Sequence, residues 1–130
     1  MEAEGGAYGG LGSAFDSLGD FETAVYYHHQ RLDIAKKIGD KDGEATAHGY
    51  LGNVYLSLGD FKKALYYYLR RLSIAKDLGD KAGEGRAYSH LGSTYQHIGD
   101  YDKAMVYYDW RLCIAQELED KAGEGAACGI

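Results

Sequence analysis

Apolar and small residues recur along the chain at helical spacing, in segments that short polar turns separate. One such segment runs from about Asp42 to Leu58, and its regular positions include His48, Leu51 and Tyr55. This spacing is typical of a helix that buries one face. A second segment, residues 61–78, has two apolar faces, so we expect a helix that is covered on both sides.

The turns between these segments share one pattern, a glycine followed by an aspartate. Gly59 suits the left-handed residue that ends a helix. Asp60 suits the N-cap of the next helix, where a carboxylate accepts backbone N–H groups. Gly79-Asp80 repeats the pattern, whereas Glu119 replaces the glycine one unit later. The pattern predicts paired helices joined by short turns.

The whole pattern repeats every 40 residues. The segments 47–86 and 87–126 are identical at just over half of their positions. A period of this length indicates a solenoid, in which each helix pair is covered by the next pair. We therefore predict an all-α fold and a single array over residues 1–130, with six complete helices and part of a seventh. Its repeats span about 7–46, 47–86 and 87–126, a truncated fourth runs to Ile130, and we expect a longer parent array.

Composition and charge exclude several classes of protein. A net charge of −6 argues against a nucleic-acid-binding domain, because such domains are usually basic. No apolar stretch approaches the roughly 18 residues that cross a bilayer, so we expect no membrane insertion. The N-terminus lacks the basic and apolar regions of a signal peptide, so we expect a cytoplasmic protein. Cys113 and Cys128 lack zinc-like spacing, and we expect reduced thiols.

Residues that would support catalysis are missing from the pattern. No Cys–His, Ser–His or paired-carboxylate arrangement recurs, and no glycine-rich phosphate loop follows a strand. Adjacent side chains diverge on a helix, so His28 and His29 cannot share a metal ion well. His90 and His97 lack a third ligand. We predict no enzyme activity, no cofactor and no metal site.

The motif Leu-Gly-x-x-Tyr, followed by alanine and then by an aromatic residue, resembles the tetratricopeptide signature. Leu51, Gly52, Tyr55, Ala64 and Tyr68 carry it. The 40-residue unit, with Gly-Asp-Lys-x-Gly-Glu, resembles the G-protein-signalling modulator family of the Partner of Inscuteable type. That resemblance implies a right-handed α-solenoid whose inner groove binds extended or helical segments of polarity or signalling proteins.

The resemblance also implies which residues line the groove. In that family an asparagine after Leu-Gly and nearby arginines hold the ligand; Asn53 matches this asparagine, whereas Ser13 and Ser93 replace it in the other repeats. The implied groove positions lie on the first helix of the second and third repeats: Thr46, Gly49, Asn53, Leu56, Ser57, Arg86, Ser89, Ser93, Gln96 and His97. A plain solvated face is the alternative interpretation.

Other recurring residues favour structural roles. Arg31, Arg71 and Arg111 recur without exception, as do Glu44, Glu84 and Glu124. We expect an Arg–Glu ladder between repeats, with ligand binding as the lesser alternative, and we expect the tyrosines to pack in the core. A peptide-binding scaffold is the favoured function. The alternatives are an architectural array that stacks head to tail with other copies, and an engineered repeat protein without a natural partner.

Overall fold

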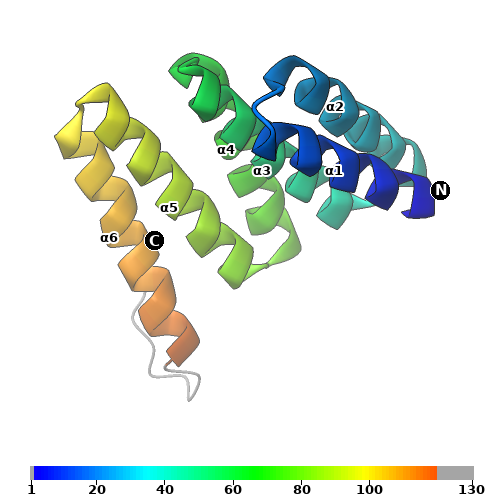
Figure 1. Ribbon diagram of the computed structural model, residues 1–130. Coiled ribbons are helices and arrows are strands. Elements are labelled where there is room, and N and C mark those ends of the chain that lie inside the picture. The colour runs from blue at the N-terminus through cyan, green and yellow to red at the C-terminus, as the bar shows by residue number, and fades with distance from the viewer. Residues whose placement is uncertain (1, 120–130) are drawn as a thin grey trace. The chain divides into compact units, whose positions relative to one another are not determined.

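The computed structural model describes the backbone of residues 2–119 and the side chains of residues 8–118. This part of the chain is all-α and contains no strand (Figure 1). Its six helices are α1 (Glu2–Ser17), α2 (Phe21–Ile38), α3 (Lys41–Leu58), α4 (Phe61–Leu78), α5 (Lys81–Ile98) and α6 (Tyr101–Glu119). The predicted paired helices are confirmed. The predicted start of a seventh helix lies outside the described residues.

The helix ends have the predicted chemistry. Gly39 ends α2 with a φ of 71°, and Gly59 ends α3 with a φ of 81°, both in the left-handed region that suits glycine. At the start of α3, the Oδ1 atom of Asp40 accepts a hydrogen bond of 2.9 Å from the backbone N–H of Gly43. The glycine–aspartate pair therefore ends one helix and caps the next.

Two compact units make up the chain, Met1–Ile74 and Ala75–Ile130, with their boundary inside α4. In the first unit, α2 packs against both α1 and α3. The buried residues Leu32, Ala47 and Leu51 form a core cluster between α2 and α3, and Val25, Tyr55 and Tyr67 pack against it. Within this unit, the first helix of the second repeat thus covers the second helix of the first repeat.

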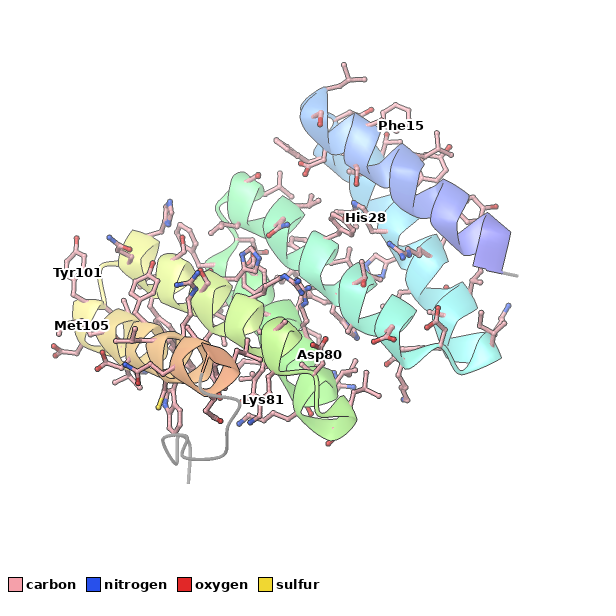
Figure 2. The ribbon with its side chains drawn as sticks, turned by 90° about the horizontal axis from the view of Figure 1, so that it is seen from below. Phe15, His28, Asp80, Lys81, Tyr101 and Met105 are labelled. Atoms are coloured by element: carbon pink, nitrogen blue, oxygen red, sulfur yellow. The ribbon has the colours of Figure 1, made fainter. Side chains whose placement is uncertain are left out.

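Glycine at the Leu-Gly position permits close contact between the helices of one repeat. A Cβ atom on Gly12 would lie 2.7 Å from the His28 ring, and one on Gly52 would lie 2.5 Å from the Tyr68 ring. Both rings are fully buried (Figure 2 labels His28). The missing side chain therefore allows the close approach of the two helices in both repeats.

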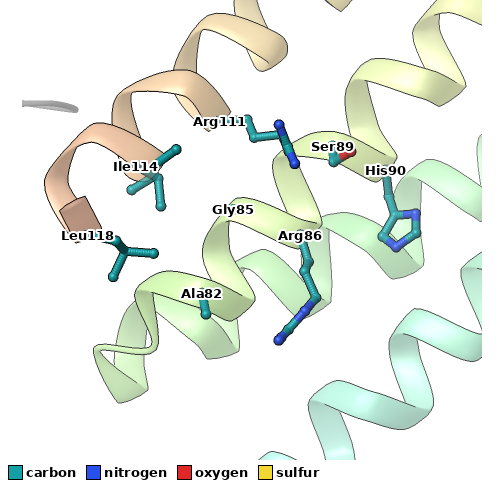
Figure 3. Close-up of a pocket in the computed structure, with 9 residues that line it drawn as sticks. Ala82, Gly85, Arg86, Ser89, His90, Arg111, Ile114 and Leu118 are labelled. Atoms are coloured by element: carbon teal, nitrogen blue, oxygen red, sulfur yellow. The ribbon is translucent and has the colours of Figure 1, made fainter.

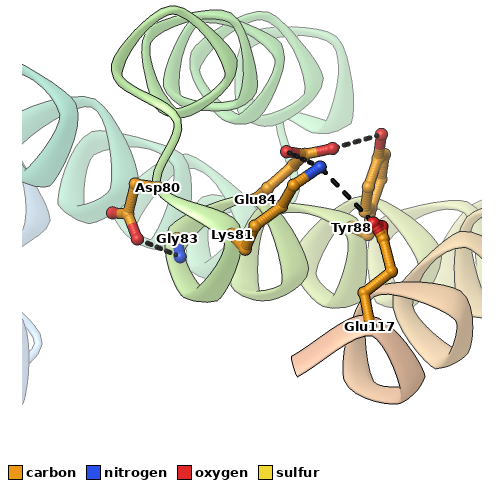
Figure 4. Close-up of polar contacts among 6 residues, drawn as sticks. All are labelled: Asp80, Lys81, Gly83, Glu84, Tyr88 and Glu117. Atoms are coloured by element: carbon orange, nitrogen blue, oxygen red, sulfur yellow. Dashed lines mark hydrogen bonds and ion pairs between the residues drawn. The ribbon is translucent and has the colours of Figure 1, made fainter. Parts of the chain in front are cut away.

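The second unit contains α5 and α6, which pack closely together. Ala87, Tyr88 and Leu91 on α5 are buried. Lys81 joins the two helices, because its Nζ atom lies 3.8 Å from Glu84 and 3.6 Å from Glu117 (Figure 4). The Tyr88 hydroxyl donates to Glu84 at 3.2 Å, so this buried carboxylate has two partners on its own helix.

The cysteines depart from the expectation made from spacing alone. Cys113 on α6 is disulfide-bonded, which contradicts the prediction of reduced thiols. Cys128 lies outside the described residues. Spacing along the sequence alone does not predict this bond. No helix within residues 2–119 is long and apolar enough to cross a membrane.

Candidate functional site

Asn53 on α3 is held in place by a tyrosine from the opposite helix. The Tyr68 hydroxyl on α4 donates a hydrogen bond of 2.6 Å to the Asn53 Oδ1 atom. Tyr68 is fully buried, and burial raises the pKa of its hydroxyl, so this group remains a neutral donor. Because the amide oxygen is used internally, the half-buried amide is oriented to donate through its NH₂ group.

The other predicted groove residues of α3 differ in how well they are placed to contact a ligand. Leu56 is half-buried and Ser57 is exposed. The hydroxyl of Thr46 donates to the backbone oxygen of Asp42 at 2.9 Å, so its proton is used within the helix. Gly49 is buried, and a Cβ atom there would lie 2.6 Å from Arg71 Nη1. The Arg71 side chain therefore covers Gly49, one of the predicted groove residues.

The second unit contains a related tyrosine–amide pair. The Tyr108 hydroxyl on α6 donates to Gln96 Oε1 at 2.9 Å. Tyr108 corresponds to Tyr68 in the repeat register, but Gln96 lies one helical turn beyond the position of Asn53. Serine occupies that position as Ser93, whose backbone oxygen lies 2.8 Å from His97 Nδ1. Since a carbonyl oxygen accepts, the nitrogen donates in this contact.

The first repeat lacks this arrangement. His28 occupies the tyrosine position there and is fully buried, and neither ring nitrogen has a hydrogen-bond partner. Burial, with a smaller contribution from Arg31, lowers the pKa of His28 to about 4, so the ring is neutral near pH 7. The tyrosine-held amide is thus a feature of the second and third repeats.

A pocket of about 290 Å³ lies between α5 and α6 (Figure 3). Its apolar residues are Ala82, Gly85, Ile114, Ala115 and Leu118.

The polar residues that line the same pocket are Arg86, Ser89, His90 and Arg111. Two of the predicted groove residues, Arg86 and Ser89, therefore meet here. Both arginines are exposed, so they can attract a carboxylate. Arg111 joins them in the pocket lining, although its recurrence in the repeats favoured a structural role.

The expected Arg–Glu ladder is not formed by Arg31 and Glu44. Glu44 lies 3.5 Å from Lys41 and 3.9 Å from His48. Arg31 instead lies over Gly9, where a Cβ atom would be 2.9 Å from its Nη1 atom. Lysine three residues before the glutamate is a nearer partner, because the two lie one turn apart on the same helix.

The structure distributes the predicted site over the two units. Thr46, Gly49, Asn53, Leu56 and Ser57 lie on α3 in the first unit. The remaining five residues lie on α5 in the second unit. Sequence reasoning missed Tyr68 and Tyr108 as positioning residues, although their shared 40-residue register was visible. Within residues 2–119, no cluster of three or more histidine, cysteine, aspartate or glutamate side chains is suited to a metal ion.

Comparisons with known proteins agree with this fold. A tetratricopeptide repeat family model matches residues 4–77 and 43–117. The crystal structure of BtubC (BKLC) from P. vanneervenii is similar with a TM-score of 0.84 and 24% identity; the match covers 89% of this chain and 48% of that one, so this chain spans about half of BtubC. The TPR domain of Arabidopsis FLU is similar with a TM-score of 0.81 and 26% identity, over 92% of this chain and 98% of that domain. No curated protein matches the chain.

Proposed function

The chain belongs to the tetratricopeptide repeat family, and we propose on that basis that it binds segments of a partner protein, along α3 in the first unit and along α5 in the second. Tetratricopeptide domains generally mediate protein–protein interaction. The observation that carries the proposal for this chain is the pair of amides held by tyrosine hydroxyls, Asn53 by Tyr68 and Gln96 by Tyr108.

A held amide suits the recognition of a peptide backbone. Once its oxygen is fixed by the tyrosine, the NH₂ group donates to a peptide carbonyl without first losing rotational freedom. A pre-oriented donor reduces the entropic cost of binding. We propose that Asn53 and Gln96 donate to the ligand backbone, each within its own unit.

The arginines suggest the chemistry of the ligand side chains. Arg86 and Arg111 are exposed, and both line the pocket of the second unit. A guanidinium binds carboxylates through two parallel hydrogen bonds. We therefore propose a ligand segment with at least one acidic residue. Following the resemblance to the Partner of Inscuteable type, we propose a cytoplasmic signalling or polarity protein as its source.

Selection of peptides from a random library on the immobilised 130-residue chain, followed by calorimetry, tests this function. The double variant Asn53→Ala with Arg86→Ala should weaken a selected acidic peptide at least tenfold, about 1.4 kcal/mol. The matched control is Gln30→Ala with Arg70→Ala, which removes an amide and an exposed arginine from the second helices of their repeats. This control should bind the peptide as tightly as the unmodified chain.

Two results would count against the proposal. Equal weakening by the two double variants would show that general charge loss, and not these positions, determines binding. Unchanged affinity in the Asn53 and Arg86 double variant would remove both residues from the site. Circular dichroism of each variant separates these results from misfolding.

Head-to-tail association with other copies is the second candidate function. Leu11 on α1 is 42% exposed, whereas its register equivalents Leu51 and Leu91 are buried, and α6 exposes several apolar residues. These two surfaces are of the kinds that pack together inside a solenoid. Sedimentation over a wide concentration range tests the idea, and a chain that stays monomeric at high micromolar concentration would exclude it.

A further inference from the structure

The two helices of each repeat keep the same register. Phe15 on α1 stacks on Tyr27 of α2, with ring centroids 5.7 Å apart. The equivalent rings of the second and third repeats are stacked at 5.6 and 5.7 Å. Because this contact is retained, a position on α1 can be compared with the positions 40 and 80 residues later, on α3 and α5.

Asp16 on α1 carries a negative charge at a position that is neutral in the other two repeats. Its equivalents are Leu56 on α3 and Gln96 on α5, which both belong to the predicted groove. Helix α1 contacts α3 within the first unit, so Asp16 and Leu56 lie on neighbouring helices. Asp16 therefore adds a carboxylate to the groove of the first unit.

No hydroxyl group of α2 holds Asp16 in the way that Tyr108 holds Gln96. The Tyr108 hydroxyl donates to Gln96 Oε1 at 2.9 Å, whereas His28 occupies the equivalent position on α2. The His28 ring is fully buried, and neither of its nitrogens has a hydrogen-bond partner among the described residues. His28 therefore donates nothing to the Asp16 carboxylate.

Other cations of the first unit do not compensate. Helix α1 contains no lysine, arginine or histidine. Arg31 of α2 lies over Gly9, which is about 10 Å along the helix axis from Asp16. The side chains that the structure describes form no hydrogen bond or ion pair with the Asp16 carboxylate.

The position of Asp16 makes this charge unfavourable for folding. Asp16 lies in the last turn of α1, where the negative end of the helix dipole disfavours a carboxylate. The side chain is partly buried, and burial raises the pKa of the Asp16 carboxyl above its usual value. A cationic ligand group would relieve both effects.

We propose that Asp16 binds a lysine or arginine side chain of the partner, and thereby selects segments that carry a basic residue at this point of the first unit. Such a side chain donates charge-assisted hydrogen bonds to a carboxylate. Its aliphatic part would contact Leu56, which is half-buried on the neighbouring helix. This role of Asp16 rests on the function proposed above and gives the first unit a preference opposite in charge to that of the second.

Thermal unfolding tests the premise without a ligand. Asp16→Asn removes the charge and keeps the shape of the side chain, so it should raise the midpoint of unfolding at pH 7 by about 1–4 °C. Asp33→Asn makes the same change at an exposed position of α2, where Lys36 and Lys37 follow within about one turn, and should not raise it. A lower midpoint for Asp16→Asn would show that the folded chain already pairs this carboxylate, and would overturn the proposal.

Binding is measured with peptides selected from a random library on the unmodified 130-residue chain. These peptides should share a basic residue, and one of them is compared by calorimetry with a copy in which glutamine replaces that residue. Asp16→Asn should weaken the basic peptide about fivefold and change the affinity of the glutamine peptide by less than about twofold, because only the basic residue pairs with Asp16. Asp33→Asn should affect neither peptide.

Failure of this role can be told apart from failure of the proposed function. Selected peptides without a shared basic residue, or equal weakening of both peptides by Asp16→Asn, would overturn the role of Asp16. If Asn53→Ala still weakens the same peptides, the proposed function stands and Asp16 alone is excluded. If neither Asn53→Ala nor Asp16→Asn weakens any selected peptide, both proposals are wrong.

Discussion

The second helices α2 and α6 occupy equivalent positions in their repeats but meet different surroundings. Leu32 on α2 is 5% exposed, because α3 packs on it in the same unit, whereas the equivalent Leu112 on α6 is 56% exposed. Both are leucines on well-formed helices. The burial of a second helix in this fold therefore depends on the first helix of the following repeat, and its own sequence provides only the surface.

The largest expected effect comes from truncating a buried leucine of α2. Leu32→Ala should lower the free energy of unfolding by about 2–5 kcal/mol, because it leaves a cavity between α2 and α3. Met105→Ala, at an exposed position of α6, should change it by less than about 0.5 kcal/mol. Urea unfolding measures both. Similar losses would mean that α6 is as well covered as α2.

Lowering the pH should destabilise the chain through His28, a fully buried polar residue on α2. Burial lowers the pKa of His28 to about 4 in the folded chain, from a usual value of 6.5. The unfolded state therefore binds the proton first, and stability falls as the pH falls from about 6.5 towards 4. Between pH 7.5 and pH 5 this residue should cost about 2 kcal/mol.

The matched variant is His28→Phe, which should lose about 2 kcal/mol less than the unmodified chain over the same pH interval. His48, whose pKa is also lowered to about 4 by burial, remains in both proteins and provides a shared background. Urea titrations at several pH values measure the difference. Parallel pH profiles would show that the His28 ring is already solvated in the folded state.

Two glycine-to-alanine substitutions distinguish the effect of close packing on stability from the effect of helix propensity. Gly52→Ala places a Cβ atom 2.5 Å from the Tyr68 ring and should destabilise the first unit by about 1–2 kcal/mol, despite the better helix propensity of alanine. Gly10 has no atom within 4 Å of its Cβ position, so Gly10→Ala should stabilise the chain by up to about 1 kcal/mol. Thermal unfolding of both variants checks the opposite signs.

The two tyrosine-held amides should differ in their contribution to stability. Tyr68→Phe removes the hydroxyl that donates a part-buried hydrogen bond to Asn53 and should cost about 1 kcal/mol. Tyr108→Phe acts at an exposed Gln96 and should cost less than about 0.5 kcal/mol, because water replaces the lost partner. If the two costs are equal, burial does not distinguish the two pairs.

The repeat register explains why the fold was predictable and part of the site was not. Gly59 and Asp60 predicted a helix end and a cap, because these roles depend on neighbours along the chain. The contact between Tyr68 and Asn53 depends on how two helices face each other, which spacing does not specify. The Arg–Glu ladder failed for Arg31 and Glu44 for a related reason, since Lys41 on the same helix reaches Glu44 first. The resemblance placed Asn53 and Gln96 in the predicted groove but did not indicate what holds them.

The side-chain amide signals of the chain provide the most direct test of the proposed binding surface. The sequence contains four such groups, on Asn53, Gln96, Gln30 and Gln116. In nitrogen–proton correlation spectra, addition of a selected acidic peptide should shift the NH₂ signals of Asn53 and Gln96, because both donate to the ligand. The signals of Gln30 and Gln116, on the second helices of their repeats, should stay in place. Saturable binding that shifts Gln30 or Gln116 and leaves Asn53 and Gln96 unchanged would contradict the proposed function.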